Sequence, residues 1–249
     1  MLRPALTVAT SPLRKFSPWR GQVFSGQALG KDLEYQALEQ HGIPVPKWRV
    51  LRCDAPNDLS EFGEYLVSKP VYGGRGRDVK IKRTKRIHNK PAAKPDHLAQ
   101  QFIYTGSWPA NYRVTTFFGE ALFAWRAEAD HNRRPIAAPD SFPDGGISIV
   151  ASAKGCTFEL SYDAEIIGLA ERAAAAFPTI PLLGVDLIRE QSTGRVYVLE
   201  VNAGGQVWSF STPTGRGIQE RGGFNLESQF DGLRKMAAIL VEQARRHAA

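Results

Sequence analysis

Residues 183–202, LGVDLIREQSTGRVYVLEVN, decide the fold of this 249-residue chain. Its two ends, Leu183–Arg189 and Val196–Asn202, are rich in β-branched and other apolar residues, and the polar stretch Ser192-Thr193-Gly194 lies between them. This arrangement predicts two antiparallel strands joined by a turn. Pairing of the two strands brings side chains from both onto shared faces of the hairpin.

The polar side chains of this hairpin are expected to gather on one face. Pairing across the turn places Asp186 opposite either Leu199 or Glu200. In the second register Asp186 and Glu200 share a face, and the two-residue period of a strand adds Asn202 to it. The neighbours expected on the opposite face, against an apolar core, are Tyr197, Leu199 and Val201.

Two carboxylates and an amide oxygen beside a core are costly unless a cation neutralises them. Hard oxygen ligands, few in number, favour magnesium, with water and phosphate completing the octahedron. Asp186, Glu200 and Asn202 are therefore candidate metal ligands. The alternative is an ordinary hairpin whose polar face is solvated, which is the commoner meaning of such a pattern when it stands alone.

Composition narrows the function less than the hairpin does. The net charge of +7 and the pI near 9.5 favour anionic ligands, but nucleotides, acidic peptides, RNA and anionic membrane all satisfy that bias. Two cysteines, Cys53 and Cys156, without CxxC spacing argue against a disulfide scaffold or structural zinc and favour a cytoplasmic protein. No apolar run reaches the length of a membrane span.

The first 30 residues predict an N-terminal arm. The first 31 residues contain five basic residues and no acidic residue, a composition also found in organellar transit peptides. Pro4, Pro12 and Pro18 break any amphipathic helix there, so an extended arm on a bacterial protein is the more economical interpretation.

A second candidate site is a glycine loop between two predicted strands. Lys69-Pro70 precedes Gly73, Gly74 and Gly76, and an alternating run follows from Asp78 to Arg83. Three glycines let the backbone bend tightly and bring its N–H groups close to phosphate oxygens. The loop is neither a Walker loop nor a dinucleotide fingerprint, because no helix follows it. A glycine-rich hairpin without a ligand is the alternative.

Periodicity predicts the remaining elements. A helix is expected over Lys31–His41, with Leu33, Ala37 and Leu38 as its apolar residues. The other expected elements are an extended segment Lys47–Cys53, a short helix Leu59–Leu66, an exposed loop 86–97, a strand Gln100–Tyr104, a hairpin Tyr112–Phe118 and Ala121–Ala127, a functional loop 130–146, a helix Ala164–Phe177 and a long helix Leu226–Arg246.

Taken in order, these segments resemble the ATP-grasp superfamily, whose members activate carboxylates as acyl phosphates. The matching pieces are Lys31 before a helix ending in Gly-Ile-Pro-Val-Pro, Lys-Pro with its glycine loop, Gln-Gln-Phe-Ile, Asn-Tyr-Arg, Trp-Arg-Ala, Gly-Val-Asp-Leu and Leu-Glu-Val-Asn. They cover residues 31 to about 205. In style they are closest to carboxylate–amine ligases of the RimK and glutathione-synthetase type.

The resemblance implies an α+β fold in which two subdomains with antiparallel sheets enclose the nucleotide. Residues 31–104 would form the small subdomain with the glycine loop, and residues 105–249 the large subdomain with the metal site. Most such ligases carry a further α/β domain ahead of the position of Lys31, and thirty residues are too few for it. The acceptor site would then be completed by a homo-oligomer, a partner protein or the loop 130–146.

The resemblance also assigns site residues. ATP would be held by Lys31 and Lys69 at its phosphates, by Gly73, Gly74 and Gly76 over them, and by Gln100, Gln101, Phe102 and Ile103 as the hinge against adenine. Arg113 and Arg126 would face the γ-phosphate and the reacting carboxylate, as the catalytic pair. Asp186, Glu200 and Asn202 would bind two Mg²⁺ ions, with Mn²⁺ as a substitute.

The implied activity is ATP-dependent formation of an amide or peptide bond between a small-molecule or peptide carboxylate and an amine. Asn111, Gln101 and the segment after Asn202 depart from the usual pattern, so substrate identity does not transfer. The alternative is an ATP-binding but non-ligating module that binds RNA or ribosomes through Lys80–Arg86, KIKRTKR. Such a run is usually a solvated strand face, and it lacks interleaved aromatic residues, so nucleic acid is not the expected partner.

Overall fold

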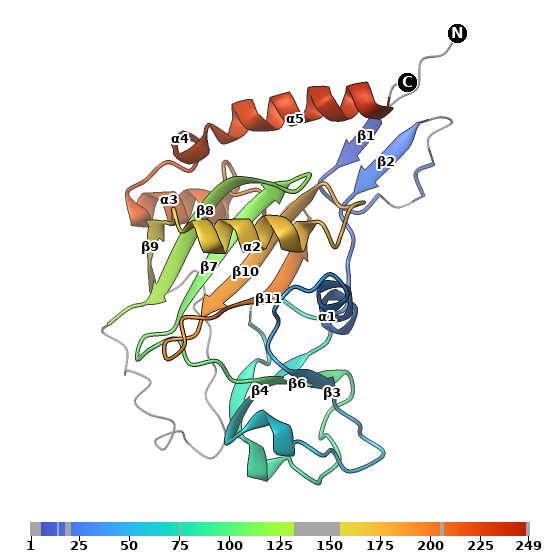
Figure 1. Ribbon diagram of the computed structural model, residues 1–249, viewed down its shortest axis with the longest axis vertical. Helices are drawn as coiled ribbons and strands as arrows, with labels where there is room; N and C mark the ends of the chain where they lie inside the picture. The colour runs from blue at the N-terminus through green and yellow to red at the C-terminus, as the bar shows by residue number, and fades with distance from the viewer. Residues whose placement is uncertain are drawn as a thin grey trace.

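The computed structural model describes residues 6–13, 15–17, 21–74, 76–131, 155–204 and 207–247. Most of the loop predicted at 130–146 lies outside these ranges. Two antiparallel sheets dominate the molecule, and Figure 1 shows the larger one above the smaller one, with helix α1 between them.

The larger sheet has five strands in the order β11-β10-β7-β8-β9. The two hairpins predicted from sequence form four of them, and β9 was not predicted. The strands are β7 (Ala110–Phe117), β8 (Glu120–Ala129), β9 (Cys156–Leu160), β10 (Leu182–Arg189) and β11 (Val196–Ala203). Every neighbouring pair is antiparallel.

The pairing of β10 with β11 contains a bulge. Asp186 lies opposite Glu200, which confirms the second of the two predicted registers, but Leu187 lies opposite Val198. Leu199 is therefore an extra residue on β11. The bulge changes the phase of the strand: Val201 and Val198 belong to the core, whereas Leu199 packs with Tyr197 in another cluster. The expectation that Tyr197 and Leu199 share the face of Val201 is wrong for this reason.

A second bulge lies in the pairing of β7 with β8. Thr116 pairs with Ala121, but Thr115 pairs with Phe123, so Leu122 is the extra residue. Without the bulge, Arg126 would lie opposite Asn111, two residues from Arg113 and on the same face. With it, Arg126 lies opposite Tyr112, on the other face of the sheet.

Helix α2 (Ala164–Ala174) covers one face of the larger sheet, in front of it in Figure 1. Asp163 caps this helix by accepting hydrogen bonds from the N–H groups of Glu165 and Ile166. Its buried residues form one core with alternate residues of the strands, including Val114, Val185 and Val198. The side chains between those residues, including Arg113 and Asp186, are left for the other face.

The smaller sheet has the order β3-β6-β4-β5. Its strands are β3 (Trp48–Val50), β4 (Tyr65–Pro70), β5 (Lys80–Arg83) and β6 (His97–Gln101). The short helix predicted over Leu59–Leu66 is only a 3₁₀ turn at Ser60–Phe62, because Tyr65 and Leu66 extend strand β4 and bury their side chains. A second 3₁₀ turn, Thr84–Arg86, follows β5.

Helix α1 (Lys31–Gln40) begins and ends close to the predicted positions. Of the apolar residues named for it, Leu38 is buried, whereas Leu33 is half exposed. The buried residues are Lys31, Glu34, Tyr35 and Leu38, and two of these have ionisable side chains. A buried charged side chain needs a partner of opposite charge, which the site described below provides for Lys31.

The first and last described elements pack near the larger sheet. Strands β1 (Leu6–Ala9) and β2 (Gln22–Ser25) pair in parallel, and β1 contacts the last helix. The long C-terminal helix predicted from sequence is divided into α4 (Glu227–Phe230) and α5 (Gly232–His247), because Asp231 adopts a left-handed conformation with φ of 52°. Helix α3 (Pro213–Gly222), capped by Thr212, was not predicted. No described helix is long and apolar enough to cross a membrane.

Candidate nucleotide and metal site

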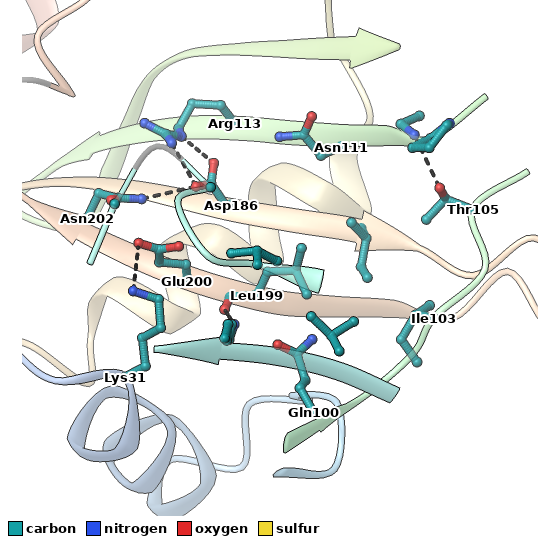
Figure 2. Close-up of a pocket in the computed structure, with 18 of the residues that line it drawn as sticks. Lys31, Gln100, Ile103, Thr105, Asn111, Arg113, Asp186, Leu199, Glu200 and Asn202 are labelled. Atoms are coloured by element: carbon teal, nitrogen blue, oxygen red, sulfur yellow. Dashed lines mark hydrogen bonds and ion pairs between the residues drawn. The ribbon is translucent and has the colours of Figure 1, made fainter. Parts of the chain in front are cut away.

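A cavity of about 690 Å³ lies between the two sheets, a size typical of ligand sites. The larger sheet contributes its acidic pair Asp186 and Glu200, and the smaller sheet contributes Lys69 and Gln100. Figure 2 shows Asp186 and Glu200 on one side of the cavity and Gln100 on the other, with Lys31 reaching in from α1. Segments far apart in the sequence thus meet at one site.

Four side chains form a row across the larger sheet. Glu200 lies opposite Asp186, Asp186 opposite Arg113, and Arg113 opposite Trp125, on strands β11, β10, β7 and β8. All four line the cavity. Directly opposed residues on neighbouring strands have Cβ atoms about 4.5–5.5 Å apart. The row therefore places two acids, a cation and an aromatic ring side by side.

Ion pairs neutralise the acidic pair within the protein (Figure 2). Arg113 Nη2 donates to Asp186 Oδ2 over 2.7 Å, and its Nε donates to Asp186 Oδ1. Lys31 Nζ lies 3.4 Å from Glu200 Oε1, and Asn202 Nδ2 donates to Asp186 Oδ2 over 3.0 Å. Burial raises the pKa of Asp186, and the adjacent Arg113 counteracts that rise.

These residues fit a hard divalent cation. The described residues hold no group of three or more His, Cys, Asp or Glu side chains that suits a metal. The cluster instead offers two carboxylates and one amide oxygen, a small set of hard oxygen donors. Magnesium is usually bound by one or two carboxylates together with phosphate and water, so this donor set agrees with magnesium carried on a phosphate group.

Arg113 depends on a glycine beneath it. A Cβ at Gly184 would lie 3.0 Å from Arg113 Nη1 and 2.7 Å from Val207 Cγ1. No side chain fits there without moving one of these groups. The glycine in Gly-Val-Asp-Leu therefore leaves room for the arginine that pairs with Asp186.

Lys69 is buried, and its ammonium group faces Tyr35. Lys69 Nζ donates to Tyr35 Oη over 2.7 Å and lies 3.4 Å from the carbonyl oxygen of Leu199. Tyr35 Oη is also 2.6 Å from that carbonyl and 3.0 Å from Gln100 Oε1, and it donates its one proton to one of them. Burial lowers the pKa of Lys69 to about 8.

The glycine loop closes one side of the cavity. Gly73, Gly74 and Gly76 line it between β4 and β5, as the strand–loop–strand prediction requires. The carbonyl oxygen of Gly73 accepts a hydrogen bond of 2.9 Å from Lys31 Nζ. Lys31 thereby connects the loop to Glu200.

The segment predicted as the adenine hinge also lines the cavity. Ile103 packs with Ile188 and Tyr197, and Phe102 packs against Tyr65 and Ile81. Gln101 Oε1 accepts a hydrogen bond of 3.3 Å from the backbone N–H of Lys47. This end of the cavity is therefore a mainly apolar slot edged by main chain.

Arg126 is the one predicted site residue that the structure does not bring to the cavity. The bulge at Leu122 turns it to the α2 face, where Nη1 donates to Glu159 Oε1 over 2.9 Å and Nη2 donates to Glu128. The position beside Arg113 belongs to Trp125 instead. The assignment of Arg126 to the γ-phosphate is therefore not retained.

Comparison with known proteins agrees with this geometry. The protein-family model that describes the ATP-grasp domain matches residues 29–204 of this chain. The chain belongs to the ATP-grasp family. The assignment made from the ordered motifs is confirmed, as is the α+β fold with antiparallel sheets. A comparison with curated protein sequences finds no match.

Solved structures of ATP-grasp proteins share this fold. They include D-cycloserine synthetase DcsG (TM-score 0.54, 20% identity, 77% of this chain and 68% of that one), ATP-grasp ligase PsnB complexed with minimal precursor (0.54, 20%, 84% and 61%) and D-alanine–D-alanine ligase from Bacillus anthracis (0.53, 17%, 86% and 68%). At these identities the likeness shows the fold alone. The chain spans 58–68% of the length of these three and the other PsnB structures.

Several residues of this ATP-grasp site carried no recognisable signal in the sequence. Tyr35 and Glu34 lie at positions of α1 where the helical period around Leu33 pointed elsewhere. Trp125 immediately precedes Arg126, the arginine that the resemblance assigned to the γ-phosphate. Further cavity-lining residues that were missed include Phe158, Ser209, Thr214 and Ile218.

Glu34 gives the ligand-free protein a pH-dependent stability. It is 5% exposed, and burial followed by the charge of Glu200 raises its pKa from 4.5 to about 8. The unfolded chain loses this proton near pH 4.5, whereas the folded protein keeps it to about pH 8. Stability from this group is therefore present at low pH and decreases as the pH rises through that window.

Glu34→Gln should remove this slope. We expect the variant to be more stable than the wild type at pH 8 by about 1–3 kcal/mol, and the difference to shrink toward pH 5. Urea unfolding in EDTA at pH 5, 6, 7 and 8 measures it. The control is Glu39→Gln, on the exposed side of the same helix. Parallel pH profiles for wild type and Glu34→Gln would contradict the prediction.

Proposed function

We propose that this protein is an ATP-dependent ligase that joins a carboxylate to an amine through an acyl-phosphate intermediate. The observation that carries the proposal is the row Glu200, Asp186 and Arg113, which faces Lys31 and Lys69 across one cavity. Acids that hold metal, next to cations that hold phosphate, are the arrangement that phosphoryl transfer requires.

ATP and two Mg²⁺ ions, replaceable by Mn²⁺, are the proposed cofactors. Asp186, Glu200 and Asn202 would hold the metal, which when bound neutralises the phosphate oxygens during transfer. Lys31 and Lys69 would bind the phosphates under the glycines of the β4–β5 loop. Adenine would lie in the apolar slot beside Gln100–Ile103.

The proposed chemistry follows from the charges. An oxygen of the substrate carboxylate attacks the γ-phosphorus, the bond to the β-phosphate oxygen breaks, and ADP leaves. The amine nitrogen then attacks the acyl carbon, inorganic phosphate leaves, and the amine loses a proton. Arg113 would stabilise the negative charge that collects where carboxylate and phosphate meet.

The boundaries and surroundings of this site are also part of the proposal. We keep residues 31–104 and 105–249 as the two subdomains, residues 1–30 as an arm, and a small-molecule or peptide substrate pair. A second copy or a partner protein completing the acceptor site stays a proposal. Neither Cys53 nor Cys156 forms a disulfide among the described residues, which supports a reducing, cytoplasmic location.

The test is a screen of carboxylate and amine pairs. We expect magnesium-dependent ADP formation that rises when a suitable pair is supplied, with a product heavier than the acid by the amine minus water. ADP release and mass spectrometry measure it. Tight ATP binding without carboxylate-dependent ADP release would contradict the ligase.

The competing function is an RNA- or ribosome-binding module. Its basic run begins in β5, where Ile81 is part of the core and Arg83 pairs with Glu64 over 3.2 Å. The run is therefore not a continuous basic surface. RNA binding that is tight, salt-steep and unaffected by ATP would favour this module over the ligase.

A further inference from the structure

The cavity continues past the charged row into an apolar pocket. Trp125 ends the row, and its ring lies 5.9 Å from the guanidinium carbon of Arg113. Phe158 on β9 packs edge-on against Trp125, with ring centroids 5.5 Å apart. Ile218 of α3 completes the wall, and all three residues line the cavity.

This wall is rigid and buried. Trp125, Phe158 and Ile218 are 8%, 7% and 4% exposed, and they belong to one hydrophobic cluster with residues of α5. The guanidinium of Arg221 also lies over the Phe158 ring, 4.8 Å from its centroid. Apolar side chains that border a cavity while anchored in a core provide a preformed surface for an apolar ligand group.

The pocket is distinct from the adenine slot. The slot is lined by Ile103, Ile188 and Leu199, next to strand β11 at one side of the larger sheet. The pocket lies on β8 and β9 at the other side, beyond Arg113. A group in this pocket is therefore attached to the atoms that react beside Arg113, not to the nucleotide base.

Polar atoms around the pocket complement a substrate with both a donor and an acceptor. Trp125 Nε1 and Asn111 Oδ1 are buried without a hydrogen-bond partner among the described residues. Unpartnered buried polar atoms are unfavourable, so partners supplied by a ligand would stabilise this arrangement. An amino group and a carboxylate are one such pair.

We infer that the carboxylate substrate is an amino acid or peptide residue with an aromatic or large aliphatic side chain, held by Trp125, Phe158 and Ile218. The inference rests on the proposed ligase function and names its substrate class. The side chain occupies the apolar pocket, and the carboxylate lies by Arg113 and the metal ligands. Trp125 on β8 and Ile218 on α3 then act as specificity residues that contact the substrate side chain.

The test uses hydroxylamine as the amine, so that the acyl phosphate is trapped as a hydroxamate. L-phenylalanine, L-leucine, L-alanine and L-aspartate are compared, both free and as the C-terminal residue of glycyl dipeptides. We expect kcat/KM for phenylalanine or leucine to exceed that for alanine by about 10- to 100-fold, because the large side chain is buried. Aspartate should be the poorest substrate.

Variants separate the pocket from the fold. Trp125→Ala and Ile218→Ala should each lower the preference for large side chains at least about tenfold, with KM for ATP unchanged. Trp125→Phe, which keeps an aromatic ring, should retain most of the preference for large side chains. The control is Tyr162→Ala, an exposed aromatic just beyond the same strand β9. Melting temperatures identify any variant that fails to fold.

A binding measurement distinguishes this inference from the ligase itself. L-phenylalanine is titrated into protein loaded with magnesium and a non-hydrolysable ATP analogue, and the heat of binding is recorded by calorimetry. Binding that Trp125→Ala abolishes, without any hydroxamate, would support the pocket and overturn the ligase. Hydroxamate formed equally well from alanine or aspartate, or a preference unchanged in Trp125→Ala and Ile218→Ala, would overturn the pocket and leave the ligase.

Discussion

Glu200→Ala should reduce ATP turnover by about 10³-fold or more, because the metal would lose one of its two carboxylate ligands while the phosphates would keep their charge. The same change should weaken magnesium-dependent ATP binding. Only one carboxylate, Asp186, would be left, and Arg113 already engages both of its oxygens. ADP release and magnesium titration of ATP binding measure the two effects.

The matched control for this prediction is Glu190→Ala. Glu190 lies at the end of the same hairpin, where it accepts a hydrogen bond from Thr193, and it does not line the cavity. Glu190→Ala should change ATP turnover by no more than about twofold relative to the wild type. Unchanged turnover and unchanged magnesium–ATP binding in Glu200→Ala would mean that the metal site has been assigned to the wrong residues.

Lys69→Met should weaken ATP binding by about 10- to 100-fold without destabilising the protein. A charge-assisted hydrogen bond to phosphate contributes about 1.5–3 kcal/mol. In the ligand-free protein, however, burial disfavours the charged form, as the lowered pKa of about 8 shows. Methionine fills a similar volume without that cost, and Tyr35 can still donate to Leu199.

Lys69→Met should affect ATP affinity and thermal stability differently. Isothermal titration should show the weaker ATP affinity, while the melting temperature at pH 7 should stay equal or rise. Wild-type affinity should also decrease above about pH 8, as Lys69 loses its proton, and the variant should lack that decrease. Lys85→Met, on the exposed part of the basic run, is the control. Equal loss of affinity in both variants would point to general electrostatic attraction.

The sequence was sufficient for the parts of the site that follow local patterns. Alternation placed Asp186, Glu200 and Asn202 on one face, and the glycines after Lys69 predicted a strand–loop–strand unit. The order of the motifs identified the superfamily. These features depend on residue spacing within one hairpin or one loop, which a single sequence contains.

The errors have one physical origin in the two bulges. A single extra residue reverses the side-chain phase of everything beyond it on the strand. Leu122 moved Arg126 off the site and left Trp125 beside Arg113. The bulge at Leu199 likewise placed Tyr197 on the opposite face of β11 from the one expected. Nothing in the local composition distinguishes these leucines from their neighbours, because a bulge is selected by packing against distant elements.

Tyr35 and Glu34 were missed for a related reason. Helical periodicity locates an apolar stripe, and it cannot indicate that a helix presents charged residues to a site built by other segments. Their role depends on the packing of β4 and β11 against α1. This packing brings Tyr35 to Lys69 and Leu199, and Glu34 to Glu200. Tertiary contacts supply this information, between residues that lie 34 and 164 positions apart in the chain.

The bulges at Leu122 and Leu199 also determine where the chain can change its length. Removing either leucine would restore regular pairing and keep every other side chain of its hairpin on its present face, at the cost of that leucine's own contacts. Removing Val201 instead would place Asn202 opposite Val185 and turn its amide toward the core face of the sheet. In these two hairpins, tolerance to deletion is therefore concentrated at the bulges.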